Sequence, residues 1–367
     1  ERECTAAAVY TLNRVKAAPL YVTMDHLENG EAQGIVANSG NANACAPNSH
    51  EHAERMCELA AAATGLKASD FVVASTGVIG QELNIAAIEQ GLPQAAAQLS
   101  KDGSDAAANA IMTTDTMKKE LAVSCMVGGK TVTIGAIAKG SGMIHPNMCT
   151  MLGFVTTDAA ISKEMLQKAL SANIKDTFNM VSVDGDTSTN DTVLLLANGM
   201  AGNLEITEEG ADFDKFMEAL NYINTCLSKK IAGDGEGATA LFEVKILGAK
   251  TKEDAVTLSK SVVTSSLTKA AIYGHDANWG RILCAMGYSG VQFDPEKVDL
   301  YFESRAGKLK IIENGVSTGY DEAEATKILS EDEVTAIADM KMGDATATAW
   351  GCDLTYDYVK INADYRS

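Results

Sequence analysis

Short apolar runs alternate along the chain with longer segments in which apolar residues recur every three or four positions. Short runs that are rich in β-branched or aromatic residues and bounded by Gly, Asn or Asp predict strands, and the longer spacing predicts amphipathic helices. The predicted strands are Gly34–Ala37, Phe71–Ala74, Leu121–Cys125, Thr131–Ala138, Leu152–Thr156, Val193–Ala197, Phe242–Leu247, Val298–Phe302 and Lys308–Ile312. The predicted helices are Glu51–Thr64, Ile85–Leu99, Lys163–Ile174, Phe213–Lys229, Lys252–Ile272 and Glu331–Ala338, the last with Ser330 and Glu333 as a capping box. This mixture predicts a layered α/β or α+β protein.

Charge and composition narrow the class of partner. The chain has 30 Lys and Arg against 49 Asp and Glu, a net charge of −19, so it repels nucleic-acid phosphates and anionic lipids. No apolar run approaches the roughly 20 residues of a membrane helix. The eight cysteines occur singly without a C-x-x-C pair, which is typical of reduced cytosolic thiols. We expect a cytoplasmic protein that binds neither nucleic acid nor membranes.

Three familiar binding motifs are absent. Gly129-Lys130-Thr131 lacks the earlier glycine of a phosphate-binding loop, since position 124 is Ser. Asp184-Gly185-Asp186 begins like a calcium-binding loop, but the sixth and twelfth positions are Thr189 and Leu195. The five histidines form no H-E-x-x-H pattern. The sequence therefore predicts no metal and no cofactor.

Three segments are rich in Gly, Ser, Thr, Asn and Asp and poor in Lys and Glu. They are Asn38–Cys45, Lys139–Thr150 and Asp184–Thr192. Small hydrogen-bonding residues with permissive backbones suit tight loops around a ligand, although plain turns have the same composition.

The residue types in one of these segments suit a specific reaction. Lys139–Thr150 runs through a glycine-rich loop to Cys149 and Thr150, just before a predicted strand. If the Cys149–Thr150 bond breaks, the Thr150 hydroxyl lies beside its own free amine, which titrates at about pH 8 and can act as its base. The same hydroxyl can make the cut by attacking the Cys149 carbonyl. From this segment alone, Thr150 is either a nucleophile or an ordinary residue at a strand start.

Further motifs resemble one known family, the self-cleaving ornithine acetyltransferases, or glutamate N-acetyltransferases, of arginine biosynthesis. The hallmark corresponds to Lys139–Met143 followed by Pro146–Leu152, with Cys149 where the family most often has Ala. The other matching stretches, in order, are Leu12–Pro19, Asn38–Cys45, Ser75–Gly80, Thr113–Thr116, Asp184–Thr192, Gly233–Thr239, Asn278–Gly290 and Asn362–Ser367.

The resemblance implies a role for individual residues. Thr150 would take the acetyl group of N-acetylornithine and pass it to glutamate in two displacements, after cleavage between Cys149 and Thr150. Thr76 and Gly77 would form the oxyanion hole, a role that suits a hydroxyl and a backbone N–H in an accessible turn. The implied substrate-binding positions are Thr113, Lys139, Thr150, Glu236, Asn362 and Ser367. Lys139 could meet a substrate carboxylate. Glu236 could pair with a substrate amine or tune the Thr150 amine, and acetyl-CoA stays open as a second donor.

The resemblance also implies a fold and an assembly. The fold would be an α/β, layered αββα-type sandwich with a smaller lobe at about residues 240–345. Segment 1–149 would end at the cleavage site and segment 150–367 would begin at the nucleophile, and two copies of each would assemble. Two other functions stay open: a terminal-nucleophile amidohydrolase or aminopeptidase, and a protein that keeps the fold without enzymatic activity.

Overall fold

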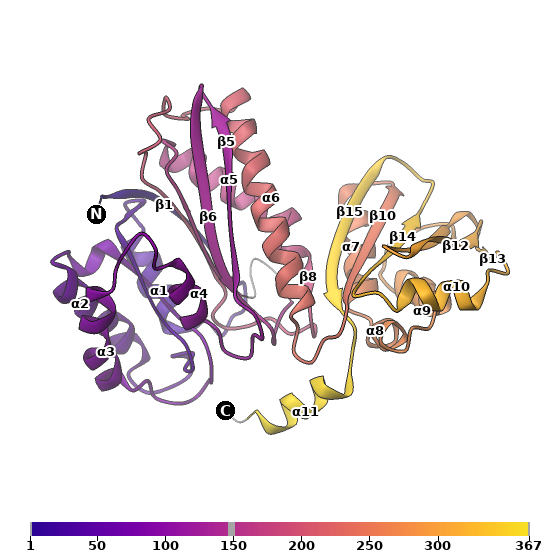
Figure 1. Ribbon diagram of the computed structural model, residues 1–367, viewed down its shortest axis with the longest axis horizontal. Coiled ribbons are helices and arrows are strands. Elements are labelled where there is room, and N and C mark those ends of the chain that lie inside the picture. Colours follow the sequence, from indigo (N-terminus) through magenta and orange to yellow (C-terminus); the bar gives the residue numbers. More distant parts are fainter. Residues whose placement is uncertain (1, 146–150, 366–367) are drawn as a thin grey trace.

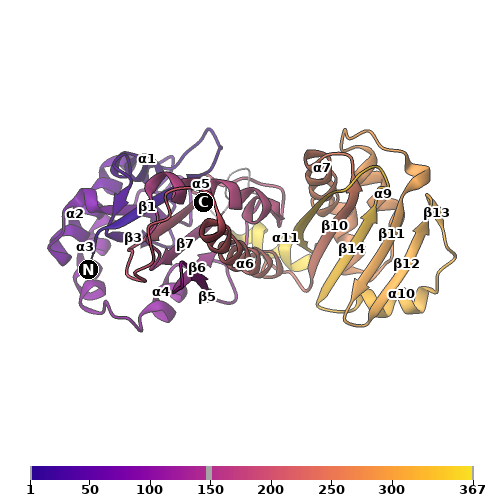
Figure 2. The ribbon, with the colours of Figure 1, turned by 90° about the horizontal axis from the view of Figure 1, so that it is seen from above.

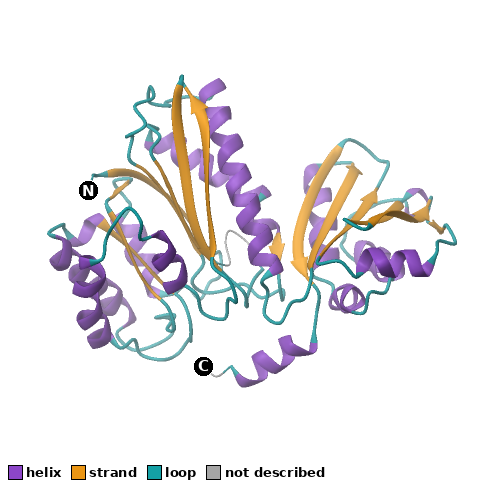
Figure 3. Cartoon of the chain, in the orientation of Figure 1, coloured by secondary structure: helices purple, strands orange, loops and turns teal. Residues whose placement is uncertain are grey.

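Three β-sheets with helices packed against them make up the protein (Figures 1 and 3). The structure is a computed structural model that describes residues 2–145 and 151–365. The predicted mixed α/β class is confirmed. Within the described residues, no helix has the length and apolar character that crossing a membrane requires.

A six-stranded sheet forms the centre of the first lobe. Its order is β2 (Glu31–Ala32), β1 (Cys4–Tyr10), β9 (Thr192–Ala197), β7 (Leu152–Thr157), β6 (Lys130–Lys139) and β5 (Lys119–Val127). Only β7 and β9 run parallel, and the other neighbours are antiparallel. The two strands after residue 150, β9 and β7, therefore lie side by side between strands from before it.

Further layers cover both faces of this sheet. On one face lies the parallel pair β3 (Gly34–Asn38) and β4 (Phe71–Ser75), whose Val72 and Ala74 share a core with Phe154 and Leu194. Helices α1 (Ala18–His26), α2 (Ser49–Thr64) and α3 (Ile85–Ala97) pack outside this pair, with a 3-10 turn at Ala68–Asp70. The long helices α5 (Lys163–Asp176) and α6 (Ala211–Gly233) cover the opposite face, and the short α4 (Ser104–Ala110) lies beside β5 and β6. The first lobe thus has two sheets between two helical layers.

The third sheet, with seven strands, builds the other lobe (Figure 2). Its order is β13 (Val316–Ser317), β12 (Gly307–Glu313), β11 (Asp299–Ser304), β14 (Glu333–Asp339), β10 (Leu241–Ala249), β15 (Ala345–Cys352) and β8 (Val181–Ser182). Its helices are α7 (Lys252–Val263), α8 (Ser266–Tyr273), α9 (Trp279–Gly287) and α10 (Glu322–Leu329), with 3-10 turns at Phe178–Met180 and Pro295–Lys297. Helix α6 contacts strands of both large sheets, so it joins the lobes. The last helix, α11 (Tyr356–Asp364), leads back from the second lobe below the first (Figure 1).

Two helix predictions require correction. The prediction of a helix over Glu331–Ala338 is wrong, because these residues mostly form β14, which lies between β11 and β10. Val334, Ala336 and Ala338 are buried there, and pairing on both edges outweighs the weak helical spacing. Ser330 instead follows the end of α10. The predicted helix Lys252–Ile272 is two helices, since the Ser265 hydroxyl accepts the Thr268 N–H and starts α8 anew.

Candidate active site

Three strand ends meet at one edge of the six-stranded sheet. Lys139 ends β6 and pairs with Leu152, the first residue of β7, which pairs in turn with Thr192, the first residue of β9. The Thr192 N–H also donates to the Met151 carbonyl at 2.9 Å. Met151 therefore lies beside β9. Thr150, the predicted nucleophile, directly precedes Met151 in the sequence. Of the predicted site residues, Cys149, Thr150 and Ser367 lie outside the described residues.

The predicted oxyanion turn follows directly on β4. The Thr76 N–H donates a hydrogen bond to the Asn38 carbonyl at 3.1 Å. The Thr76 hydroxyl oxygen accepts a hydrogen bond from the Lys139 ammonium at 3.3 Å. Gly77 has φ +132°, and a Cβ there would lie 2.2 Å from the Gly40 carbonyl carbon, so only glycine fits. Within the described part of the chain, no acceptor is present for the Gly77 N–H. The turn can thus offer a hydroxyl and an N–H to a developing oxyanion.

The Asp184–Thr192 loop anchors this turn to the sheet edge. The buried Asn190 side-chain amide donates to the Ser75 carbonyl at 2.8 Å and to the Ala42 carbonyl at 2.6 Å. Both acceptors belong to the segments that frame Thr76. This loop stands out on the sequence by its composition alone, and in the structure it holds the turn at Thr76 in place.

Lys139 is a buried cation at the centre of the site. Its ammonium lies 3.8 Å from the Asp115 carboxylate, and only 7% of the residue is exposed. Burial lowers the pKa of Lys139 below its usual value, although the negative charges of Asp115, Asp191 and Glu236 oppose this. Lys139 can therefore pair with a substrate anion that enters beside Thr76.

Asp115 links Lys139 to Thr113, another predicted site residue. Its carboxylate accepts the Thr113 N–H at 3.1 Å and the Gly140 N–H at 2.7 Å. Burial alone would raise the pKa of Asp115, but the nearby ammonium groups of Lys139 and Lys119 hold it below its usual value. The carboxylate is therefore charged at neutral pH and fixes both loops.

Glu236 and Asn362 meet although 126 positions separate them. The Asn362 amide donates to Glu236 Oε2 at 2.8 Å, and the Glu236 N–H donates to the Ser141 carbonyl at 3.0 Å. Asn362 lies within helix α11, so this part of the C-terminal region is helical and in contact with the site. A Cβ at Gly142 would lie 2.3 Å from the Glu236 carboxyl carbon, which shows how tightly the loop after β6 covers it.

The structure adds a buried acid that the sequence analysis does not assign. Asp191 is 2% exposed, and among residues 2–145 and 151–365 its Oδ2 has no hydrogen-bond partner. Burial raises the pKa of Asp191 well above its usual value, although the Ser188 hydroxyl, Lys139, the Thr11 hydroxyl and the Met151 N–H oppose the rise. On the sequence, the only indication of a role for Asp191 is its position inside the Asp184–Thr192 segment, and composition does not show which way its side chain points.

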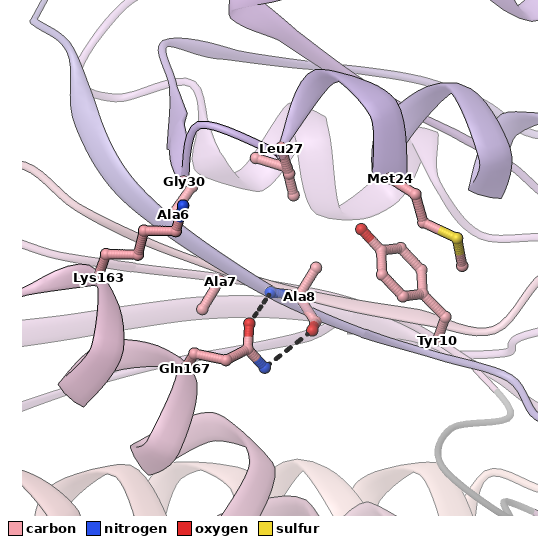
Figure 4. Close-up of a pocket in the computed structure, with 9 residues that line it drawn as sticks. All are labelled: Ala6, Ala7, Ala8, Tyr10, Met24, Leu27, Gly30, Lys163 and Gln167. Carbon is pink, nitrogen blue, oxygen red and sulfur yellow. Dashed lines mark hydrogen bonds between the residues drawn. The ribbon is translucent and has the colours of Figure 1, made fainter.

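Two cavities lie away from this cluster. One, of about 210 Å³, lies between β1, α1 and α5, where Gln167 is bonded to the Ala8 backbone (Figure 4). The other, of about 320 Å³, lies at the starts of α8 and α9 and includes Arg281 and Cys284. None of the described site residues lines either cavity. Over residues 2–145 and 151–365, no group of three His, Cys, Asp or Glu side chains is arranged to hold a metal ion.

The fold and the site define an α/β protein that gathers hydrogen-bond donors, a buried cation and a carboxylate around the start of one strand. Comparison with known proteins extends this. The model of the ArgJ family matches residues 1–367. The arginine biosynthesis bifunctional protein ArgJ 1 of Clostridium acetobutylicum is 51% identical, covering 100% of this chain and 90% of its own. The ArgJ protein of Symbiobacterium thermophilum is 54% identical, covering 99% and 90%.

A solved structure agrees. A chain of the arginine biosynthesis bifunctional protein argJ from Bacillus halodurans is 48% identical with a TM-score of 0.56, and the match covers 59% of this chain and 100% of that one. The chain described here belongs to the ArgJ family. The predicted family, an acyltransferase family of arginine biosynthesis, is thereby confirmed.

Proposed function

We propose that this protein transfers an acetyl group from N-acetylornithine to glutamate through an ester on Thr150. The Thr150 hydroxyl attacks the acetyl carbonyl, the amide C–N bond breaks, and ornithine leaves with a proton from the Thr150 amine. The glutamate amine then attacks the ester, the C–O bond breaks, and the Thr150 oxygen recovers its proton. Two displacements of this kind give ping-pong kinetics.

One observation carries the proposal. The Thr76 hydroxyl lies 3.3 Å from the Lys139 ammonium at the sheet edge where β7 begins, two residues after Thr150. This arrangement supports an oxyanion hole made by the Thr76 hydroxyl and the Gly77 N–H beside the nucleophile. Acetyl-CoA, as a second donor, would load the same hydroxyl.

The substrate roles follow from charge. Lys139 binds the substrate α-carboxylate, and Glu236, held by Asn362, binds the amine. Thr113 and Ser367 complete the binding site, as the resemblance implies. N-acetylornithine carries a carboxylate and, in addition to the acetylated nitrogen, one free amine, so a buried cation and a buried carboxylate in one site suit this substrate.

The proposal includes cleavage between Cys149 and Thr150. It is supported by the length of the solved Bacillus chain: the match covers 59% of this chain, the share that residues 150–367 make up, 218 of 367. It is also supported by the strand order, because β7 and β9 are hydrogen-bonded to strands from before residue 149 and would keep the fragments together. The proposal includes the layered αββα-type sandwich, which is supported by the two sheets and two helical layers of the first lobe. The proposal extends to an assembly of two copies of each segment in the cytoplasm.

The test uses the purified protein and its Thr150→Ala variant. Mass spectrometry of the wild type should give fragments of 149 and 218 residues, and incubation with N-acetylornithine should add one acetyl group to the second. The variant should stay intact and transfer nothing. Acetyl transfer by the variant would mean that another residue is the nucleophile, and release of acetate without ornithine-to-glutamate exchange would identify a hydrolase.

A further inference from the structure

A buried ion network lies directly behind the residues proposed to bind substrate, and the chemistry above does not use it. Lys119 is wholly buried, with its ammonium 2.6 Å from Asp115 and 2.5 Å from Asp234. Taking three charges out of water costs free energy, so a buried ion network contributes little net stability to the fold. Stability alone therefore does not explain why these three residues are charged.

The two carboxylates differ in what else they hold. Asp234 accepts the Thr116 N–H at 3.1 Å, the Thr116 hydroxyl and the Met117 N–H, all in the loop before β5. Asp115 accepts the N–H groups of Thr113 and Gly140 and lies 3.8 Å from the Lys139 ammonium. Of these two carboxylates, only that of Asp115 lies within 4 Å of the Lys139 ammonium, whereas Asp234 reaches the loop after β6 through its backbone carbonyl, which accepts the Ser141 hydroxyl at 2.8 Å.

We propose that Asp115 is a positioning residue for acetyl transfer. Asp115 holds the Lys139 ammonium at the position where the substrate carboxylate binds, and it also holds the backbone on either side of the site. Lys119 and Asp234 keep Asp115 in place. This inference rests on the proposed function, because it requires Lys139 to bind the substrate. Asp115 itself touches no reacting atom.

The surroundings of Lys139 predict how the loss of Asp115 would appear. The charged groups that act on Lys139 are Asp115, Asp191, Glu236 and, with the same sign, Lys119. Burial lowers the pKa of Lys139, and Asp115 is the largest influence that opposes this. Because Lys139 binds a carboxylate only when protonated, Asp115→Asn should move the alkaline limb of kcat/KM to lower pH by about one unit.

The experiment compares Asp115→Asn with Asp234→Asn in the full-length protein. Each variant removes one carboxylate from Lys119 and keeps the side-chain shape, so each should lower Tm. We expect kcat/KM for N-acetylornithine to fall about tenfold or more in Asp115→Asn, together with the shifted pH profile. Asp234→Asn should keep the wild-type profile. Equal losses with the same unshifted profile in both variants would overturn the inference.

A second pair of variants serves if Asp115→Asn does not fold. The double variant Asp115→Asn/Lys119→Met has no buried ammonium at position 119 and is compared with Lys119→Met alone. A lower kcat/KM in the double variant supports the role of Asp115, and equal values contradict it. Thr150→Ala separates the two proposals. If the wild type transfers acetyl and Thr150→Ala does not, the proposed function stands. If kcat/KM and the pH profile are then the same in Asp115→Asn and Asp234→Asn, only the positioning role of Asp115 fails.

Discussion

The side-chain amide of Asn190 donates to the Ser75 carbonyl at 2.8 Å and so ties the start of β9 to the end of β4. The same amide holds the Ala42 carbonyl. Asn190→Ala leaves two buried carbonyls without this donor, which should cost about 1–3 kcal/mol of stability. Because Thr76 follows Ser75 directly, kcat should also fall by about tenfold to a hundredfold. Thermal unfolding and steady-state kinetics measure the two effects, and a stable variant with wild-type kcat would contradict the anchoring role.

Gly77 should tolerate no side chain. In Gly77→Ala the Cβ would lie 2.2 Å from the Gly40 carbonyl carbon, so the turn must move and its N–H with it. Loss of one oxyanion donor lowers kcat by about 10²–10³. The control is Gly80→Ala in the same turn, which also has positive φ but open space for a Cβ. A comparable loss in both variants would indicate backbone strain rather than a displaced donor.

Gly142→Ala should act on substrate binding through Glu236. The new methyl group would displace the Glu236 carboxylate, which lies 2.3 Å from the Cβ position, and disturb its bond with Asn362. We expect KM for N-acetylornithine and glutamate to rise about tenfold, with a smaller change in kcat. Gly91→Ala, a substitution into open space on α3, is the control and should leave KM unchanged. An unaltered KM in Gly142→Ala would remove Glu236 from the binding site.

His145 should make the fold sensitive to mild acid. Burial lowers the pKa of His145 from 6.5 to about 4, with a smaller contribution from Lys260. Between these values the unfolded chain takes up a proton that the folded chain does not, so stability falls as the pH drops from about 6.5 towards 4. His145→Gln should reduce this slope, as followed by Tm between pH 7 and 5. The exposed His50 provides the control variant His50→Gln, and an equal slope in wild type and His145→Gln would refute the prediction.

The sequence predicts most strands and the long helices because burial repeats at regular intervals within each. It fails where pairing partners decide the outcome. Glu333–Asp339 has weak helical spacing, but strands on both sides make it β14. The Ala-rich β1 contains only one β-branched residue after Thr5, and no strand is predicted there, yet it pairs with β9 from Thr5 to Tyr10. Local propensity is a weak guide for such segments.

The candidate site shows a similar limit. The polar loop that contains Asn190 stands out by composition. The loops that contain Asp115 and Asp234 match stretches of the family, and the same resemblance supplies roles for Thr76 and Lys139. Neither source indicates that Asp115 and Asp234 share Lys119, since the two acids are far apart along the chain and meet only after both loops have folded. Charge and composition identify candidate residues, but long-range packing determines which of them touch.

The pairing of β1 with β9 has a consequence for biosynthesis. Thr5 pairs with Ala197, so β1 has no neighbour on that side until synthesis has passed Ala197, 192 residues further along the chain (197 − 5). Such distant contacts slow the search for the native topology. Any reaction that depends on residues beside β9 therefore has to wait until β9 has been synthesised, and premature termination upstream of β9 would leave this edge of β1 open to other nascent chains.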